Sequence, residues 1–376
     1  MILPADHLFM AQAIKLARRG RFTCHPNPRV GALLVQNGVV VGEGFHQRAG
    51  EPHAEPIALS VAGSCAQGAT VYVTLEPCSH HGRTPPCADA LIRAGVSRVV
   101  VAMEDPNPVV AGRGVERLRQ AGIEVQVGLL ESEAQRLNPG FIKRMRHGLP
   151  FVRCKLAMSL DGRTAMASGE SKWITSDAAR RDVHRLRALG SAVMTGVGTV
   201  IADDAALNVR LPASALEGVE PDDLPPPQRV VLDSRLRMPL HSKMLSLPGE
   251  TTILCLEGEP ERRAALEAAG AAVVSLPECN GRVDLHAALR YLARQEINEI
   301  LLEAGPQLAG SMLQAGLLDE LVIYMAPHLM GDGAKGLFHL PDLLQMQDRI
   351  ELEIADIRAV GRDWRITATP SNCCNL

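Results

Sequence analysis

The feature that most constrains this chain is the alternation of short β-rich runs with runs of helical periodicity. The alternation opens on two strands around Asn37-Gly38, a dipeptide typical of a tight hairpin turn. Strands separated by helices predict a mostly parallel sheet covered on both faces, here with one hairpin at its start. In the first part of the chain we expect an amphipathic helix within 1–21, strands at 30–35, 39–43, 70–75, 98–103 and 123–127, and helices at 53–62, 87–94 and 114–121.

The same α/β alternation resumes after a polar, basic passage at 138–147. At 376 residues the chain is longer than one hydrophobic core normally supports, so we expect two domains, 1–147 and 148–376. We expect the proline-rich segment 216–228, within the loop 211–228, to lie on the surface, and the tail with Cys373-Cys374 to have no clear role. In the second part we expect strands at 151–158, 192–195, 229–232, 252–256, 272–276, 299–303, 320–326, 350–358 and 363–369, and helices at 177–189, 261–269, 285–294 and 307–315.

Charge and composition exclude several classes of function. Lys+Arg 39 and Asp+Glu 42 give a formal net charge of −3, and the chain holds only six Phe, two Trp and three Tyr. A nucleic-acid binder usually carries a basic excess and stacking aromatics, so we expect no nucleic-acid partner. No apolar run approaches the roughly 18 residues that span a bilayer, and the first residues do not read as a secretory leader. Nine cysteines, an odd and scattered number, argue against a disulfide framework. We therefore expect a soluble, cytoplasmic protein with no membrane partner.

The densest chemistry lies in His53-Ala54-Glu55, Pro77-Cys78 and Cys87. One imidazole and two thiolates make three zinc ligands and leave a fourth position for water, which is the pattern of a catalytic site. Zinc lowers the pKa of such a water to about 7. Glu55, two residues after a ligand, is placed to carry the proton from that water to a leaving amine. The order matches the first part of the zinc nucleobase-deaminase signature.

The spacing of the cysteines departs from that signature. Eight residues separate Cys78 from Cys87, where the general pattern has two. The polar content of this loop, above all His80 and Arg83, indicates a wall for a substrate larger or more anionic than cytidine. His80 or His81 remains an alternative zinc ligand in place of one cysteine. Taken singly, the His53-Ala54-Glu55 segment also fits a solvent-exposed helix face, and the cysteines also fit buried thiols without a metal.

The second part of the chain shows weaker signals. Two glycine turns, Thr195-Gly196-Val197-Gly198-Thr199 and Glu303-Ala304-Gly305-Pro306, each follow a strand. Such turns let backbone N–H groups approach a phosphate, but glycine also serves tight packing there, and both interpretations stay open. Arginines between 180 and 210 offer charge for a substrate phosphate, although solvated helix faces account for most of them.

Together these motifs resemble one family, the bifunctional deaminase/reductases of riboflavin biosynthesis. The likeness extends from His25-Pro26-Asn27-Pro28 to about Thr369, and the eight-residue gap between the cysteines is the family's own form. The other segments that carry it are 50–55, 74–87, Asp105-Pro106-Asn107-Pro108, 159–165, 173–175 and 303–306.

The resemblance implies a cytidine-deaminase-like three-layer α/β/α domain followed by a dihydrofolate-reductase-like α/β domain. It implies zinc-dependent deamination of 2,5-diamino-6-ribosylamino-4(3H)-pyrimidinone 5′-phosphate, followed by NADPH-dependent reduction of the ribosyl side chain. It also implies a homo-oligomer, a dimer or a tetramer, built mainly through the reductase domains.

The resemblance also implies a role for individual residues. His53, Cys78 and Cys87 would bind zinc, and Glu55 would move the proton. The pocket around the pyrimidine nucleotide would be lined by Asn27, His46, His80 and Arg83. In the reductase half, substrate contacts would be Ser171, Arg187, Leu207, Arg210 and Glu303, with Lys155 and Asp161 as further candidates. NADPH contacts would be Ala157, Trp173, Thr199, Asp203, Ser234, Gly305, Pro306, Gln307, Leu308, Ala309, Gly310 and Ser311.

Two other classes of function compete with this interpretation. A deaminase of nucleic acids or free nucleosides conflicts with the balanced charge and with the long loop between the cysteines. A non-catalytic zinc protein would have no use for Glu55.

Overall fold

The computed structural model describes residues 2–79, 86–108, 110–212, 215–216, 219 and 223–371. The chain divides into two compact units. Unit 1 is Met1–Gly148 with Ala213–Leu224, and unit 2 is Leu149–Pro212 with Pro225–Leu376. The predicted division at 147/148 is contiguous, whereas here a segment of the second half of the sequence belongs to the first unit. Leu216 and Val219 within that segment are buried, so the expectation of a surface loop over 216–228 is wrong for these residues.

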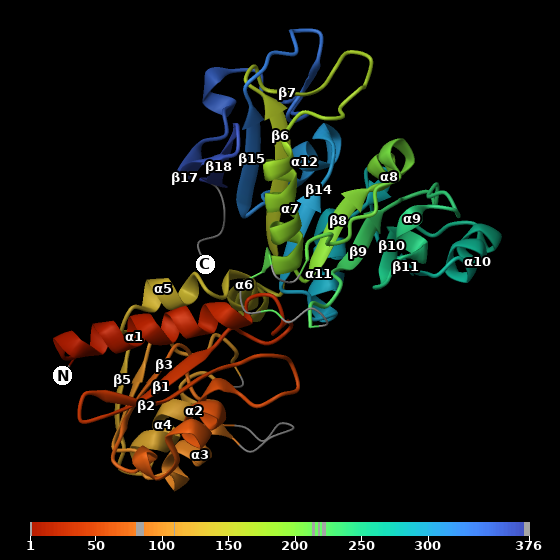
Figure 1. Cartoon of the computed structure of the whole chain (residues 1–376). Helices are drawn as coiled ribbons and strands as arrows, with labels where there is room; N and C mark the ends of the chain where they lie inside the picture. Colours follow the sequence, from red (N-terminus) through yellow and green to blue (C-terminus); the bar gives the residue numbers. More distant parts are fainter. Residues whose placement is uncertain are drawn as a thin grey trace. The chain divides into compact units, whose positions relative to one another are not determined.

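Unit 1 is a five-stranded sheet with helices on both faces, a three-layer α/β/α arrangement (Figure 1). The strand order is β2-β1-β3-β4-β5. The strands are β1 (Gly31–Gln36), β2 (Val39–Phe45), β3 (Thr70–Val73), β4 (Arg98–Val101) and β5 (Glu124–Val127). The helices are α1 (Pro4–Ala17), α2 (Ala54–Ala62), α3 (Cys87–Arg93), α4 (Arg113–Gln120), α5 (Glu131–Gln135) and α6 (Pro139–His147), with short 3₁₀ turns at Arg18–Gly20 and Gly63–Ala66.

The strand pairing of this sheet differs from the expectation of a mostly parallel sheet. β1 pairs antiparallel with β2 across the Asn37-Gly38 turn and also antiparallel with β3, while β3, β4 and β5 are parallel. The helical crossover from β2 does lead to a parallel strand, β3, but β1 lies between the two. The sheet is therefore half antiparallel.

The two faces of the sheet follow the alternation of side chains along each strand. Leu33 and Val35 face a core completed by α1, α5 and α6, whereas Ala32 and Leu34 face a core completed by α2, α3 and α4. α1 buries Met10, Ala13, Ile14 and Ala17 on one face, which confirms the amphipathic helix expected within 1–21.

The polar, basic passage predicted at 138–147 forms helix α6. Basic residues dominate its last turn, but Phe141 and Ile142 are buried on the other side and join the core. Pro139 at the first helical position and Gly148 in the left-handed region mark its two ends.

Unit 2 is a nine-stranded sheet in the order β11-β10-β9-β8-β14-β6-β15-β18-β17. From β11 to β15 every pairing is parallel, and β18 and β17 add an antiparallel edge. Its strands are β6 (Phe151–Ser159), β8 (Ala192–Gly196), β9 (Gln228–Leu232), β10 (Thr251–Cys255), β11 (Ala271–Ser275), β14 (Glu299–Glu303), β15 (Glu320–Ala326), β17 (Leu352–Val360) and β18 (Asp363–Pro370). Two small ladders pair β12 (Glu278–Cys279) with β13 (Arg282–Val283), and β7 (Arg163–Ala165) with β16 (Lys335–Gly336).

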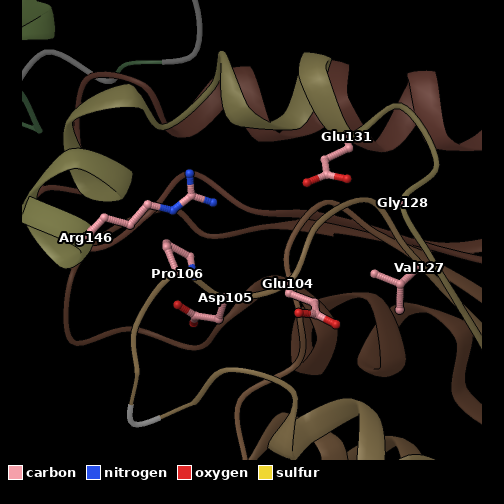
Figure 2. A pocket seen from close by; sticks show the side chains of 7 residues that line it. All are labelled: Glu104, Asp105, Pro106, Val127, Gly128, Glu131 and Arg146. Atoms are coloured by element: carbon pink, nitrogen blue, oxygen red, sulfur yellow. The ribbon is translucent and has the colours of Figure 1, made fainter. Parts of the chain in front are cut away.

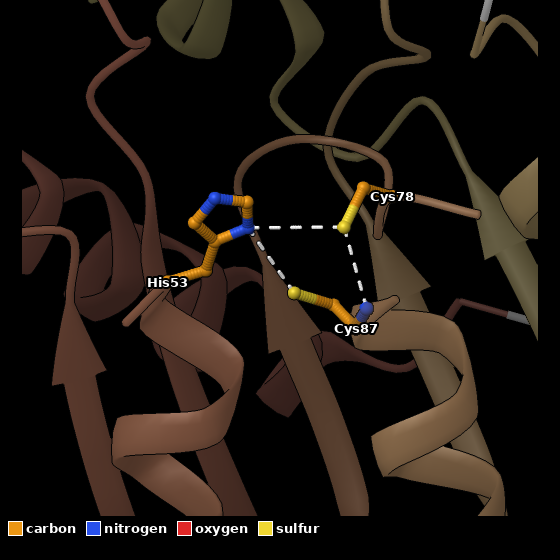
Figure 3. A group of neighbouring side chains, drawn as sticks. All are labelled: His53, Cys78 and Cys87. Atoms are coloured by element: carbon orange, nitrogen blue, oxygen red, sulfur yellow. Dashed lines mark hydrogen bonds between the residues drawn. The ribbon is translucent and has the colours of Figure 1, made fainter. Parts of the chain in front are cut away.

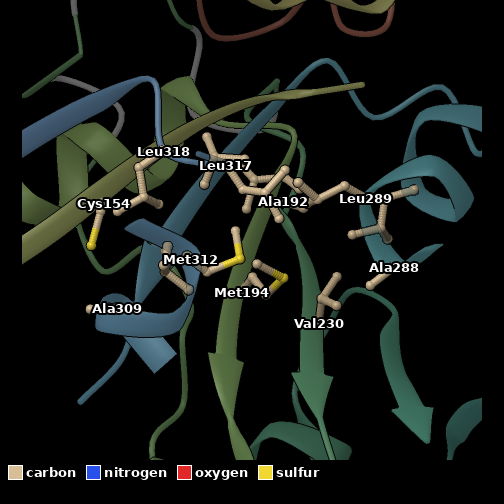
Figure 4. Packing of buried hydrophobic residues seen from close by; sticks show 14 of the residues in the cluster. Cys154, Ala192, Met194, Val230, Ala288, Leu289, Ala309, Met312, Leu317 and Leu318 are labelled. Atoms are coloured by element: carbon tan, nitrogen blue, oxygen red, sulfur yellow. The ribbon is translucent and has the colours of Figure 1, made fainter. Parts of the chain in front are cut away.

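Helices cover both faces of this larger sheet. They are α7 (Asp177–Leu189), α8 (Val197–Asp203), α9 (Lys243–Ser246), α10 (Pro260–Ala268), α11 (Leu285–Arg294) and α12 (Pro306–Gln314), with a 3₁₀ turn at Met346–Asp348. On one face α11 and α12 pack Leu289 and Met312 against Met194 and Val230 of the strands (Figure 4). On the other face α7 packs against the sheet through Val183 and neighbouring residues.

The carboxyl ends of the parallel strands meet along one side of the sheet, which is its carboxyl edge. The predicted reductase residues lie at or near this carboxyl edge. The turns after β8, β9 and β14 all lie at this edge. Among the described residues, no helix is both long and apolar enough to cross a bilayer.

Candidate functional site

Three side chains with metal-binding atoms converge in unit 1 (Figure 3). The ligand atoms of His53, Cys78 and Cys87 all lie within 4.8 Å of one another. His53 Nδ1 is 3.3 Å from Cys87 Sγ and 3.8 Å from Cys78 Sγ, and the Cys87 backbone N–H donates to Cys78 Sγ at 3.3 Å. Around a tetrahedral zinc, nitrogen and sulfur ligands would be about 3.6 Å apart. The donor set therefore fits zinc in both chemistry and spacing.

Local contacts bring the cysteine pair together. Cys87 begins α3, and Cys78 follows the end of β3, where its carbonyl accepts the backbone N–H of Ala88. The Cys87 thiol donates to Cys78, which lowers the pKa of Cys78 with further help from His53. A divalent cation between such groups would ionise both thiols.

Helix α2 brings His53 and Glu55 to these thiols. His53 is the residue that precedes the first turn of α2, and the helix packs closely on β2 because Gly42 and Gly44 have no side chain. A Cβ on Gly44 would lie 2.4 Å from the Ala54 carbonyl oxygen and 2.7 Å from the Ala58 nitrogen. Only glycine at this position allows the first turn of α2 to approach the strand so closely.

Glu55 is almost fully buried beside the metal-binding group, with 3% of its surface exposed. Burial raises the pKa of its carboxyl group to about 7, while the neighbouring His53 opposes the shift. Such a carboxyl group can both accept and return a proton near neutral pH. A nearby cation would favour its ionised form.

His46 and Asn27 form a hydrogen-bonded pair next to the same group. His46 Nε2 lies 3.0 Å from Asn27 Nδ2, and His46 Nδ1 lies 3.1 Å from the Pro52 carbonyl. These partners indicate a neutral ring that donates from Nδ1 and accepts at Nε2. Burial lowers the pKa of His46, in agreement with the neutral form. The ring stands edge-on to His53, with centroids 5.3 Å apart.

Glu76 supports the chain just before Cys78. Its buried carboxylate accepts four backbone N–H groups: Oε2 from Asp105 at 3.1 Å and Gly112 at 2.9 Å, and Oε1 from Gly114 at 2.8 Å and Val115 at 3.2 Å. A Cβ on Gly114 would lie 1.9 Å from the Pro77 carbonyl oxygen. The segment that begins α4 is therefore fixed directly against Pro77-Cys78.

A polar pocket of about 320 Å³ lies at the carboxyl ends of β4 and β5 (Figure 2). Its lining is mainly charged: Glu104, Asp105 and Glu131 supply carboxylates, and Arg146 of α6 supplies a guanidinium. Of the predicted zinc and substrate residues that the structure describes, none lines it. Asp105 links the pocket to the site, because its backbone N–H donates to Glu76.

Some predicted residues fall outside the described chain. These are His80 and Arg83 of the predicted pocket, together with the alternative ligand His81 and the pair Cys373-Cys374.

In unit 2, the predicted substrate residues from three elements come together. Arg187 of α7 forms a two-pronged ion pair with Glu303 at the end of β14, and its Nη1 donates to the Asn208 carbonyl at 2.8 Å. Lys155 of β6 is the register partner of Glu303 on the neighbouring strand. Burial opposes ionisation of both Arg187 and Glu303, but their mutual attraction outweighs it, so the pKa of Glu303 is lowered and that of Arg187 raised.

Lys155 and Arg210 lie in the same electrostatic environment. Burial lowers the pKa of Lys155, Glu303 opposes the shift and Arg187 adds to it. Burial and the charge of Arg187 also lower the pKa of Arg210. The side chain of Leu207, by contrast, is buried in the core, which leaves only its backbone for a ligand.

The predicted cofactor residues lie along the carboxyl edge of the sheet. Thr199 and Asp203 are on α8, and Asp203 pairs with Lys172 at 3.0 Å; Trp173, largely exposed, stacks against the Arg180 guanidinium. Ser234 follows β9, and its hydroxyl accepts the Val283 N–H at 3.0 Å.

The turn 305–311 opens α12. A Cβ on Gly196 would lie 3.5 Å from the Leu308 side chain, so the two glycine turns are neighbours. Within the turn, Ala309 is buried in the core. A Cβ on Gly310 would lie 2.2 Å from the His339 carbonyl oxygen, so there is no space for a side chain at this position. Packing explains the small size of these two residues. Ala157 lies within β6, and Ser171 lies in the loop before α7.

Asp161 has a structural partner. Its carboxylate accepts the backbone N–H of Gly331 at 2.8 Å and of Met330 at 3.1 Å, and the Ser159 hydroxyl donates to it as well. These bonds lower the pKa of Asp161 to about 2. They indicate a structural role for Asp161, which the resemblance names only as a further candidate for substrate contact.

Three residues that touch these sites were not predicted from the sequence. Glu76 lies in one of the motifs that carry the resemblance, but no role was assigned to it. Its position two residues before the zinc-binding Cys78 was the sequence signal that could have identified it. Asn208 belongs to the same segment as Arg210, and His184 contacts the Arg210 backbone. The sequence signal for His184 was its position three residues before Arg187, on the same face of one helix.

Two family patterns match the chain. The pattern for the cytidine and deoxycytidylate deaminase zinc-binding region matches residues 4–103, and that for the RibD C-terminal domain matches residues 150–366.

Relatives resemble the chain over almost its whole length. The riboflavin biosynthesis protein RibD of Escherichia coli K12 is 54% identical over 366 residues, which are 95% of this chain and 97% of that protein. The protein of the same name from Haemophilus influenzae is 48% identical over 97% of each chain. Among solved structures, Acinetobacter baumannii RibD (form 1) superposes with a TM-score of 0.91 at 46% identity over 98% and 99% of the two chains. A diaminohydroxyphosphoribosylaminopyrimidine deaminase/5-amino-6-(5-phosphoribosylamino)uracil reductase from Thermotoga maritima gives 0.83 at 32% identity over 97% and 99%.

Proposed function

Because the chain belongs to the RibD family of bifunctional deaminase/reductases of riboflavin biosynthesis, we propose that it catalyses both reactions named for these enzymes. The first is the hydrolytic loss of ammonia from 2,5-diamino-6-ribosylamino-4(3H)-pyrimidinone 5′-phosphate. The second is the NADPH-dependent reduction of the ribosylamino group to ribitylamino, which gives 5-amino-6-ribitylamino-uracil 5′-phosphate. We assign the first to 1–147 and the second to 148–376, with 213–224 as an addition to the first unit.

In the deaminase half, His53, Cys78 and Cys87 would hold zinc. When bound, zinc supplies a Lewis acid that makes water acidic at neutral pH. Glu55 takes a proton from the attacking water and returns it to the departing amine, a task for which its burial suits it. The proximity of its carboxyl group to the metal-binding residues supports this role.

The substrate pocket of this half would be formed by Asn27, His46, His80 and Arg83. The His46–Asn27 hydrogen bond leaves one amide hydrogen and the amide oxygen of Asn27 for a polar ring edge. Arg83 would bind the phosphate.

In the reductase half, Ser171, Arg187, Leu207, Arg210 and Glu303 would bind the ribosylamine nucleotide, with Lys155 beside Glu303. Hydride adds to the anomeric carbon of the ring-opened, imine-like form, so the main task of the protein is to place that carbon against the nicotinamide. Lys155, half-buried beside Glu303, would supply the accompanying proton to the same region. NADPH would lie along the carboxyl edge of the sheet, over Trp173, Thr199 and the turn 305–311.

The observation that carries this proposal is the convergence of three zinc donors beside a buried glutamate in unit 1. The test is Glu55→Gln in the full chain, with zinc content, ammonia release and NADPH oxidation measured separately. We expect one bound zinc, loss of ammonia release, and normal NADPH oxidation when the deaminated nucleotide is supplied. Ammonia release at the unaltered rate would refute the role of Glu55.

We also propose a homo-oligomer, dimer or tetramer, formed through unit 2. Edge strand β17 is exposed along its length, and its pairing with β18 shifts register between Ile354 and Asp356. This bulge puts Leu352, Ile354 and Ile357 on one face, because their partners Pro370, Ala368 and Ile366 alternate regularly along β18. An exposed apolar edge strand favours association with another chain.

The cytoplasm is the compartment we propose. The described cysteines are all free thiols, which fits a reducing environment.

A further inference from the structure

Helix α7 holds the segment 207–210 through two hydrogen bonds. His184 Nδ1 accepts the backbone N–H of Arg210 at 3.3 Å, and Arg187 Nη1 donates to the Asn208 carbonyl at 2.8 Å. His184 and Arg187 are three residues apart on α7 and so share one helix face. The same short stretch of helix therefore supplies both anchors.

The segment depends on such anchors because it has no regular structure of its own. Residues 204–210 belong to neither helix nor strand, and Leu207 adopts a φ of 49°, a left-handed conformation that is unfavourable for a leucine. The buried side chain of Leu207 fixes one end, and the bond to His184 fixes the other.

The charge state of His184 suits it as an acceptor. The ring is 9% exposed and lies near the guanidinium groups of Arg187 and Arg210. Burial and these two charges lower the pKa of His184 to about 4, so that the ring is neutral at neutral pH. A neutral imidazole with its proton on Nε2 can accept at Nδ1.

We propose that His184 is a positioning residue of the reductase half: it holds the Arg210 backbone so that the guanidinium meets the phosphate of the substrate. This inference rests on the proposed function, in which Arg210 binds the nucleotide. His184 itself touches neither substrate nor cofactor and acts through Arg210.

Two substitutions in the full-length enzyme distinguish the hydrogen-bond acceptor that His184 provides from the space that its ring fills. His184→Asn places an amide oxygen near the position of Nδ1, whereas His184→Leu fills similar space without an acceptor. We expect His184→Leu to raise KM for the deaminated nucleotide about tenfold, with KM for NADPH and the deaminase rate changed less than twofold. We expect His184→Asn to restore KM to within about threefold of the parent. His286→Asn and His286→Leu, at an exposed position of α11, are the matched controls.

A double-mutant comparison distinguishes this inference from the proposed function. If His184 acts through Arg210, then His184→Leu combined with Arg210→Ala binds nucleotide no more weakly than Arg210→Ala alone. Additive losses, or equal effects of His184→Leu and His184→Asn, would overturn the inference while leaving Arg210 as a ligand. An unchanged KM in Arg210→Ala would instead overturn the assignment of Arg210 on which it rests.

Discussion

Replacing Glu76 with glutamine tests whether one buried carboxylate holds the chain beside the zinc donors. Each carboxylate oxygen accepts two backbone N–H groups, from Asp105 and Gly112 on one side and from Gly114 and Val115 on the other. In Glu76→Gln one oxygen becomes an NH₂ group, which cannot accept, so two buried N–H groups lose their partner. At about 1–3 kcal/mol for each unsatisfied group, the local cost is about 2–6 kcal/mol.

Amide hydrogen exchange over 104–116, followed by mass spectrometry, measures this cost locally. A local measurement is needed because the unfolding of a chain with two units is not expected to be two-state. Even the lower value of about 2 kcal/mol should speed exchange about 30-fold, since 1.4 kcal/mol corresponds to a factor of ten. Glu116→Gln is the control, because this exposed side chain of α4 accepts a bond from Gln120 at the surface. Exchange that stays within twofold in Glu76→Gln would refute the reasoning.

Four further predictions concern both halves of the chain. Cys87→Ser should lower the zinc content measured by mass spectrometry well below one per chain, and a full complement would point to a different ligand. Dialysis against a chelator should abolish ammonia release and leave NADPH oxidation of the deaminated nucleotide intact; loss of both would contradict separate sites. The unfolded chain protonates His184 near its ordinary pKa of 6.5 but the folded chain only near 4, so its contribution to stability is complete above about pH 6.5 and declines as the pH falls toward 4. Denaturant unfolding followed by the fluorescence of Trp173 and Trp364, which both lie in unit 2, should show a shallower decline in His184→Asn, and identical pH profiles would refute this. Ile354→Lys should shift the mass measured by light scattering toward a monomer, whereas an unchanged oligomer would exclude the β17 face.

The sequence predicted most elements because their periodicity is local. The helix expected at 177–189 is α7, and the strands expected at 299–303 and 320–326 are β14 and β15. The errors concern information that is not local. β1 pairs antiparallel with β3 because it lies between β2 and β3 in the sheet. The order of strands in the sheet is not encoded in any local pattern of residues.

Helix α6 was missed for a different reason. Its basic residues gave the passage the composition of a linker, while the two apolar residues that anchor it, Phe141 and Ile142, form too short a stripe to stand out.

The two candidate sites differ in how far the sequence could predict them. His53, Glu55, Cys78 and Cys87 stand in motifs whose spacing reflects zinc chemistry, so the residues themselves predicted the cluster that the structure brings together. Lys155 and Glu303 meet only because β6 and β14 are neighbours, and the resemblance alone named them. The bond from the Arg210 N–H to His184 depends on the path of an irregular loop, which side-chain patterns do not encode.

The grouping of 213–224 with unit 1 means that the polypeptide passes between the two units three times rather than once. A gene cut between codons 148 and 149 would therefore yield a first fragment without the stretch that carries Asp223, the ion-pair partner of Arg48. That fragment would lack the carboxylate partner of Arg48, a residue of the loop that leads to His53. Division of this protein into two separate chains thus removes this contact unless the segment 213–224 is transferred with the first unit.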